Sequence, residues 1–127
     1  MKEKVKLFDI KEARWEESDN GMRSCVFKPS KAVTTQFWEI KPGAGAEPHK
    51  HPNEQLIYIQ QGVLDVTVEG ETYEVGSGCY CYVPPNAVHS TVNNGPQSCI
   101  NIDFFFPERD DRSQSERERN LNHKNWK

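Results

Sequence analysis

The sequence contains no long apolar run. Hydrophobic residues make up 35% of its 127 residues, and the mean hydropathy is −0.85. Every apolar segment is far shorter than the roughly 20 residues that a membrane-spanning helix needs. Residues 1–5 also lack the apolar core of a secretory signal peptide. We therefore expect a cytoplasmic protein with no membrane partner.

The sequence also lacks an excess of positive charge. Its 16 lysine and arginine residues face 19 aspartate and glutamate residues, and the net charge of −3 argues against a nucleic-acid partner. The 4 cysteines are expected to be reduced thiols in a cytoplasmic protein. Cys79 and Cys81 could form a metal pair on one strand. No further thiolate lies nearby, so two small strand residues are the favoured interpretation.

Helical periodicity is scarce, and only residues 11–18 could form one or two helical turns. Short segments of β character instead recur between turns rich in glycine, proline and asparagine. The expected strands are 5–8, 23–27, 33–40, 55–59, 63–68, 72–75, 79–83, 89–92 and 98–106. This spacing predicts an all-β, antiparallel sandwich or barrel in a single domain.

The most informative feature that is present is a set of metal donors. His49 and His51 stand two residues apart, so on an extended strand both would point to the same side. Gln55 keeps the same parity, and His89 could arrive on a neighbouring strand. Imidazole and amide oxygen both bind divalent metals. We predict one divalent ion per chain, with zinc, iron, nickel and manganese all possible.

Glu54 and Gln55 compete for the fourth ligand position. Strand parity favours Gln55 and turns Glu54 away, although Pro52 could introduce an irregularity that reverses this order. With Gln55 as ligand, all four donors are neutral and the ion keeps its full charge. That charge favours Lewis-acid chemistry on a carboxylate, carbonyl or enol oxygen, although three-histidine sites can also activate oxygen.

The last expected strand carries polar residues among apolar ones. Asp103 is costly to bury unless it is paired or used, and inside a barrel its pKa would rise toward a useful range. Arg109, just past the strand, could hold a carboxylate with two hydrogen bonds. The alternative is that Asn101 and Asp103 form the wet face of an edge strand and Arg109 belongs to a charged tail. The opposite, apolar face of this strand suggests a homodimer interface.

Two spaced motifs resemble those of the cupin superfamily. The first consists of Gly43, His49, His51, Gln55 and Gly62, and the family usually has glutamate at the position of Gln55. The second consists of Gly78, Pro84, Asn86, His89 and Asn93, with glycine usual at the position of Asn86. Asparagine tolerates the left-handed conformation, so this departure is mild. The resemblance implies a single-domain cupin, a double-stranded β-helix or jelly-roll barrel of antiparallel strands, with the metal inside.

On this basis the chain divides into three parts. Residues 1–32 supply N-terminal strands that complete the barrel, and residues 33–106 form the cupin core with both motifs. Residues 107–127 are a charged C-terminal tail, mobile or partly helical.

The His-x-His-Pro-x-Glu-Gln form of the first motif, with Asp103, Phe105 and Arg109 near the chain's end, is similar to the pectin-degradation cupins. Those proteins process 4,5-unsaturated uronates released by pectate or alginate lyases. The resemblance implies that the metal ligands are His49, His51, Gln55 and His89. It also implies that Asp103 and Arg109 are catalytic, and that Phe105 and Arg109 contact the substrate.

The expected function is that of a metal-dependent, isomerase-like enzyme acting on a small unsaturated sugar with a carboxylate. It would convert enol to keto and open the ring to a linear keto acid. The alternatives are a small-molecule dioxygenase on the same metal site, a non-catalytic metabolite-binding cupin, and a cupin whose metal only braces the fold.

Overall fold

The computed structural model describes residues 4–18 and 20–113, and every regular element in them is a β-strand. The strands are β1 (Glu16–Glu17), β2 (Met22–Ser30), β3 (Val33–Ile40), β4 (Gly45–His49), β5 (Glu54–Gln61), β6 (Val63–Val68), β7 (Glu71–Gly76), β8 (Tyr80–Val83), β9 (His89–Val92) and β10 (Cys99–Phe106). Within the described ranges, no helix of the length and apolarity needed to cross a membrane occurs.

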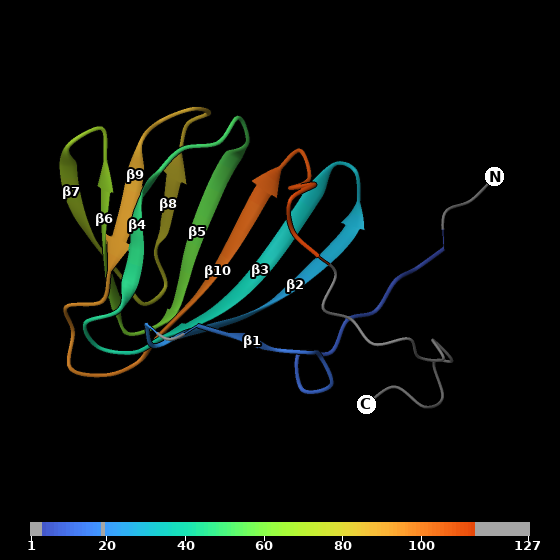
Figure 1. The fold of residues 1–127 in the computed structure, drawn as a ribbon, viewed down its shortest axis with the longest axis horizontal. Coiled ribbons are helices and arrows are strands. Elements are labelled where there is room, and N and C mark those ends of the chain that lie inside the picture. The colour runs from blue at the N-terminus through green and yellow to red at the C-terminus, as the bar shows by residue number, and fades with distance from the viewer. Residues whose placement is uncertain (1–3, 19, 114–127) are drawn as a thin grey trace.

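The strands form two antiparallel sheets that face each other (Figure 1). The six-stranded sheet has the order β1-β2-β3-β10-β5-β8, and the four-stranded sheet has the order β4-β9-β6-β7. One apolar core lies between them, with Ile57 and Ile59 from the larger sheet and Leu64 and Val66 from the smaller one. The predicted all-β jelly-roll fold is confirmed.

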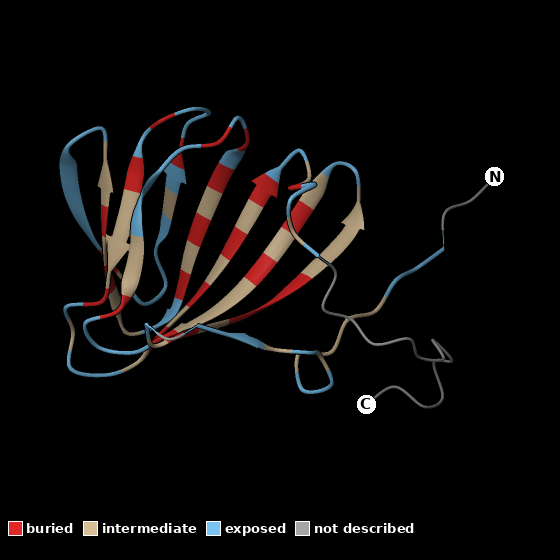
Figure 2. Cartoon of the chain, viewed as in Figure 1, coloured by how far each residue is buried: buried red, intermediate tan, exposed pale blue. Residues whose placement is uncertain are grey.

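Strand β10 is central, because it pairs with β3 on one side and with β5 on the other. Its residues alternate between the interior and the outer face, as the bands in Figure 2 show. Asn101, Asp103 and Phe105 are buried on the inner face, whereas Ile102 and Phe104 are half-buried on the outer face. The alternative of a wet edge strand is therefore wrong.

The N-terminal segment differs from its prediction. Residues 5–8 form no strand; instead Phe8 stacks on Phe27 with ring centroids 4.9 Å apart. Residues 11–18 form no helix but a turn followed by the short strand β1. Trp15 packs edge-on against Phe37. Phe8 and Trp15 thus cover β2 and β3, and the short strand β1 extends the sheet by pairing with β2.

The barrel also contains a strand that local patterning does not reveal. Strand β4 reads Gly45–His49 and pairs with β9. A Cβ on Gly45 would lie 1.9 Å from the backbone oxygen of Thr91, so only glycine permits this approach. Gly45 therefore allows β4 to lie against β9 and brings His49 opposite His89 in the register.

Candidate metal centre

The four predicted metal donors converge from both sheets. His49 ends β4, His89 begins β9, and Gln55 lies on β5 in the opposite sheet. His51 lies in the loop between β4 and β5. The expectation that three donors share one ribbon is wrong, because the chain leaves β4 after His49 and bends at Pro52 before it enters β5.

Hydrogen bonds fix the loop that carries His51. The backbone oxygen of His51 accepts a bond from the backbone N–H of Asn86 at 2.8 Å, and Asn86 has the left-handed φ of 61° that its motif position suggested. Asn53 is buried, and its amide donates to the backbone oxygen of Pro107 at 2.7 Å. Glu54 is exposed and accepts a bond from the Tyr82 hydroxyl, so it points away from the site as expected.

The three histidines present ring nitrogens to one point. Their candidate ligand atoms all lie within 4.8 Å of one another. The Nδ1 atoms contact backbone oxygens: His49 at Glu47 (2.7 Å), His51 at Asn53 (3.1 Å) and His89 at Ala87 (2.8 Å). A carbonyl can only accept, so Nδ1 of His49 and of His89 carries the proton, and Nε2 of each keeps its lone pair. This arrangement is typical of histidines that bind metal.

Buried atoms without partners mark the same place. Among the described residues, only two buried side-chain nitrogen or oxygen atoms lack a hydrogen-bond partner, His89 Nε2 and Arg109 Nη1. A buried lone pair without a partner costs about 1–3 kcal/mol. The lone pair of an unprotonated Nε2 can bind a metal ion, so the residues present fit a metal.

The contacts of Gln55 give a second indication that the site fits a metal. Its Oε1 lies 2.9 Å from His51 Nε2, and its side chain also hydrogen-bonds to Asp103. A carboxylate needs a donor, so the NH₂ group of Gln55 faces Asp103 and Oε1 faces His51. A proton on His51 Nε2 joins the two atoms when no ion is bound. A metal ion can take the place of that proton, because nitrogen and oxygen ligands of one ion lie about 3 Å apart.

Burial keeps His51 and His89 in the form that binds metal. It lowers the pKa of His89 to about 4, and it also lowers the pKa of His51. Both imidazoles are therefore neutral near pH 7, and metal binding does not require the loss of a proton from either ring.

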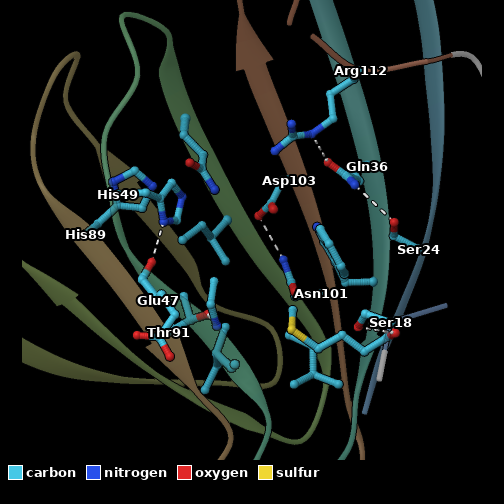
Figure 3. Close-up of a pocket in the computed structure, with 18 of the residues that line it drawn as sticks. Ser18, Ser24, Gln36, Glu47, His49, His89, Thr91, Asn101, Asp103 and Arg112 are labelled. Carbon is cyan, nitrogen blue, oxygen red and sulfur yellow. Dashed lines mark hydrogen bonds between the residues drawn. The ribbon is translucent and has the colours of Figure 1, made fainter. Parts of the chain in front are cut away.

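A cavity of about 430 Å³ lies next to the donors, between the two sheets. It runs from His49 and His89 toward β1, and it is large enough for a small ligand. Figure 3 shows His49 and His89 on one side and Asp103 with Arg112 on the other. Phe105 and Arg109 line it as well, so all predicted site residues except His51 border this cavity. His51 does not line the cavity itself but contacts Gln55, which does.

Asp103 is the buried acid of the cavity. It lies on the inner face of β10 and accepts a hydrogen bond from Asn101 at 2.8 Å (Figure 3). Burial raises the pKa of Asp103 to about 6, while hydrogen bonds from Gln55, Asn101 and Trp38 act in the opposite direction. The carboxyl group can thus take up and release a proton near neutral pH.

Arg109 is held at the end of β10. Its backbone N–H donates to the hydroxyl of Thr34 at 2.8 Å, and its guanidinium lies 4.8 Å from the ring centre of Phe105. Phe105 in turn meets the His51 ring edge-on at 5.5 Å. Phe105 therefore packs between the arginine and the metal donors.

Gln36 and Arg112 are among the cavity residues that the sequence did not predict. Gln36 is buried in β3 directly beside Asp103 in the register. Arg112 stands in a run of charged residues and is indistinguishable there from a solvated tail. Only the path of residues 107–113 brings it to the cavity.

Comparison with known proteins gives three findings. The model of the Cupin domain family matches residues 36–105. The pectin degradation protein KdgF of Dickeya dadantii is 30% identical over 101 residues, 79% of this chain and 91% of that protein. The H2HPP isomerase of Bacillus subtilis is 31% identical over 78 residues, 60% of this chain but only 33% of that longer protein.

Among solved structures, KdgF from Halomonas sp. superimposes with a TM-score of 0.77 at 28% identity. The match covers 85% of this chain and 98% of that one. The likeness therefore extends over most of this chain and nearly all of that one.

Proposed function

This chain belongs to the cupin family, and from that premise we propose that it is a metal-dependent enzyme acting on a 4,5-unsaturated uronate. The reaction is an enol-to-keto conversion with ring opening to the linear keto acid. The observation that carries this proposal is that neutral metal donors, a buried carboxyl group and a partnerless arginine nitrogen border one cavity. Relatives named for pectin degradation and for an isomerase support it.

His49, His51, Gln55 and His89 would hold one divalent ion. With four neutral donors, that ion would supply a Lewis acid whose charge no ligand cancels, suited to polarising a substrate oxygen. Zinc, iron, nickel and manganese all accept imidazole nitrogen. The neutral donor set favours this chemistry over that of a dioxygenase.

Asp103 moves the proton. Its carboxylate takes the proton of the anomeric hydroxyl, the carbonyl at carbon 1 forms, and the bond from carbon 1 to the ring oxygen breaks. The electron pair stays on that oxygen, which becomes the enolate oxygen on carbon 5. Asp103 then returns the proton to carbon 4, the double bond moves to the oxygen, and carbon 5 becomes a ketone. No atom is gained or lost, so the step is an isomerisation.

Arg109 binds the substrate carboxylate. Its Nη1 is buried and has no partner among the described residues, so it can donate to a ligand oxygen. Phe105 packs beneath the guanidinium and keeps it in the cavity. A carboxylate held there lies next to the carbons that react, because the substrate carries it on carbon 5.

The reaction is tested by the ultraviolet absorbance of unsaturated galacturonate, which disappears when the conjugated double bond is lost. We expect metal-loaded protein to accelerate this loss over the spontaneous reaction. Since Asp103 must be ionised to accept the first proton, kcat/KM should fall as the pH decreases through about 6. No acceleration, with metal confirmed in the protein, would rule out this substrate class. Substrate-dependent oxygen uptake would indicate the dioxygenase instead.

We further propose a homodimer formed through the outer face of the larger sheet. Leu56 pairs with Phe104 and Tyr58 with Ile102 in the register, so β5 and β10 present a continuous half-buried apolar surface. Light scattering should give twice the chain mass. Phe104→Glu should halve that mass without loss of metal, whereas Thr72→Glu on the smaller sheet should not. A wild-type monomer would contradict the proposal.

A further inference from the structure

Residues 107–113 are attached to the end of the barrel beside the cavity. Asn53 binds the backbone oxygens of Pro107 and Glu108, at 2.7 and 3.1 Å. Further along, the Lys28 ammonium donates to the backbone oxygen of Arg112 at 3.0 Å. Together with the bond from the Arg109 N–H to Thr34, these contacts tie the segment to the barrel along its length, and both of its cavity-lining side chains are arginines.

Asp111 joins these two arginines. Its Oδ1 accepts from Arg109 Nε at 2.9 Å, and its Oδ2 accepts from both Arg109 Nη2 at 2.8 Å and Arg112 Nη1 at 3.0 Å. The Arg109 side chain is 9% exposed and that of Asp111 is 55% exposed. Hydrogen bonds from Arg109 hold the pKa of Asp111 at about 2, so the carboxylate stays charged. Asp111 thus supplies the counter-charge that a buried guanidinium requires.

Each arginine keeps a nitrogen for a ligand. Arg109 Nη1 is buried without a partner. Arg112 uses Nε for Gln36 Oε1 at 3.1 Å and Nη1 for Asp111, while its Nη2 has no partner in the described part of the chain. Gln36 is held in turn by donating to Ser24 at 3.0 Å, so the Arg112 guanidinium is fixed from two sides (Figure 3).

We propose that Asp111 positions Arg109 and Arg112 as one two-guanidinium site for the substrate carboxylate, with Arg112 as a second carboxylate-binding residue. This inference rests on the proposed function and deepens it. Among the described residues, Asp111 is the one carboxylate that is hydrogen-bonded to the two guanidinium groups, so a substrate carboxylate can pair with the nitrogens that Asp111 leaves free. An ester carbonyl accepts a hydrogen bond but carries no charge, whereas a carboxylate accepts charge-assisted bonds from both guanidinium groups, so the site selects acids over esters.

The place of this site suits the reaction. The carboxyl groups of Asp103 and Glu16 also act on the charge of Arg112, and Gln36, which accepts from Arg112, is the register partner of Asp103. A carboxylate on Arg112 therefore lies beside the proton-transfer group. Arg112 binds and orients the substrate and moves no proton.

The test compares unsaturated galacturonate with its methyl ester in metal-loaded protein. Arg112→Met should raise KM for the acid about 10- to 100-fold and should change KM for the ester less than about 2-fold. The KM of Arg112→Lys for the acid should lie between those of the wild type and Arg112→Met, because lysine keeps the charge but cannot form two parallel hydrogen bonds to a carboxylate. Asp111→Asn should also raise KM for the acid and leave KM for the ester unchanged. Arg23→Met removes an ion pair with Glu39 outside the cavity and serves as the matched control. An equal increase in KM for acid and ester in Arg112→Met, or no increase for either, would overturn the proposal.

A binding measurement separates this inference from the proposed reaction. Calorimetry with saturated galacturonate and its methyl ester needs no turnover. If wild-type protein prefers the acid, and Arg112→Met abolishes that preference although neither protein shows turnover, the carboxylate site stands and the proposed reaction fails. If wild-type protein shows no preference for the acid, or binds neither compound, the carboxylate site is wrong.

Discussion

Replacing Asp103 with asparagine is expected to lower kcat about 1000-fold, which is the scale of general acid–base catalysis. Asparagine has the same shape and can still accept a hydrogen bond from Asn101, but it cannot take up the substrate proton. The metal donors are untouched, so the variant should keep one equivalent of metal. The rate is followed by loss of ultraviolet absorbance, and metal by elemental analysis.

The same variant should be more stable than the wild type at neutral pH. Burial raises the pKa of Asp103 from its ordinary value to about 6. The folded protein therefore binds this proton more tightly than the unfolded chain does, and wild-type stability falls as the pH rises from about 4 to about 6. The variant has no carboxyl group at this position and lacks this loss. Above about pH 6, its free energy of unfolding should therefore exceed that of the wild type by about 1–3 kcal/mol.

The stability comparison uses metal-free protein and urea unfolding at pH 4, 6 and 8. Asp110→Asn, at an exposed position next to the arginine cluster, is the matched control and should shift neither stability nor rate. An Asp103→Asn variant with near-normal turnover would remove Asp103 from the mechanism. A variant that is no more stable than the wild type at pH 8 would contradict the predicted difference in stability.

Replacing His89 with alanine is expected to abolish metal binding and reduce turnover to the spontaneous rate. His89 is 2% exposed and its Nε2 has no other partner, so removing it deletes a donor that no neighbour replaces. After dialysis, bound metal should fall from one equivalent per chain to below about 0.1, since losing one ligand weakens a site by far more than the 10–100-fold of an outer-shell change.

His123 provides the matched control, because it is the one histidine outside the two motifs. His123→Ala should keep its full metal content and activity. If His89→Ala keeps one equivalent of metal, the three-histidine centre is wrong, whatever the activity of the variant.

The sequence predicts the barrel well because strand alternation and turn residues are local signals. Strands 33–40, 63–68 and 89–92 match the structure to the residue. The four donors were identified because their spacing belongs to two motifs. The predicted route was nevertheless wrong: a bend at Pro52, rather than a continuous strand, brings His51 and Gln55 together.

The features that depend on strand order could not be predicted. Whether Asp103 faces water or the core depends on β10 lying between β3 and β5, a pairing of segments distant in sequence. Arg112 belongs to a charged run, and its place at the cavity follows from contacts such as the one between Lys28 and its backbone oxygen. Strand β4 carries few apolar residues, so no β pattern marks it.

The most direct test of a metal-dependent isomerase is a titration of activity with metal. Protein stripped by a chelator is given increasing amounts of each candidate ion, and the loss of unsaturated galacturonate absorbance is recorded. For the active ion, the rate should rise linearly to one equivalent per chain and then stay constant. A rate above the spontaneous reaction that does not depend on added metal, or no rate at any occupancy, would contradict the account.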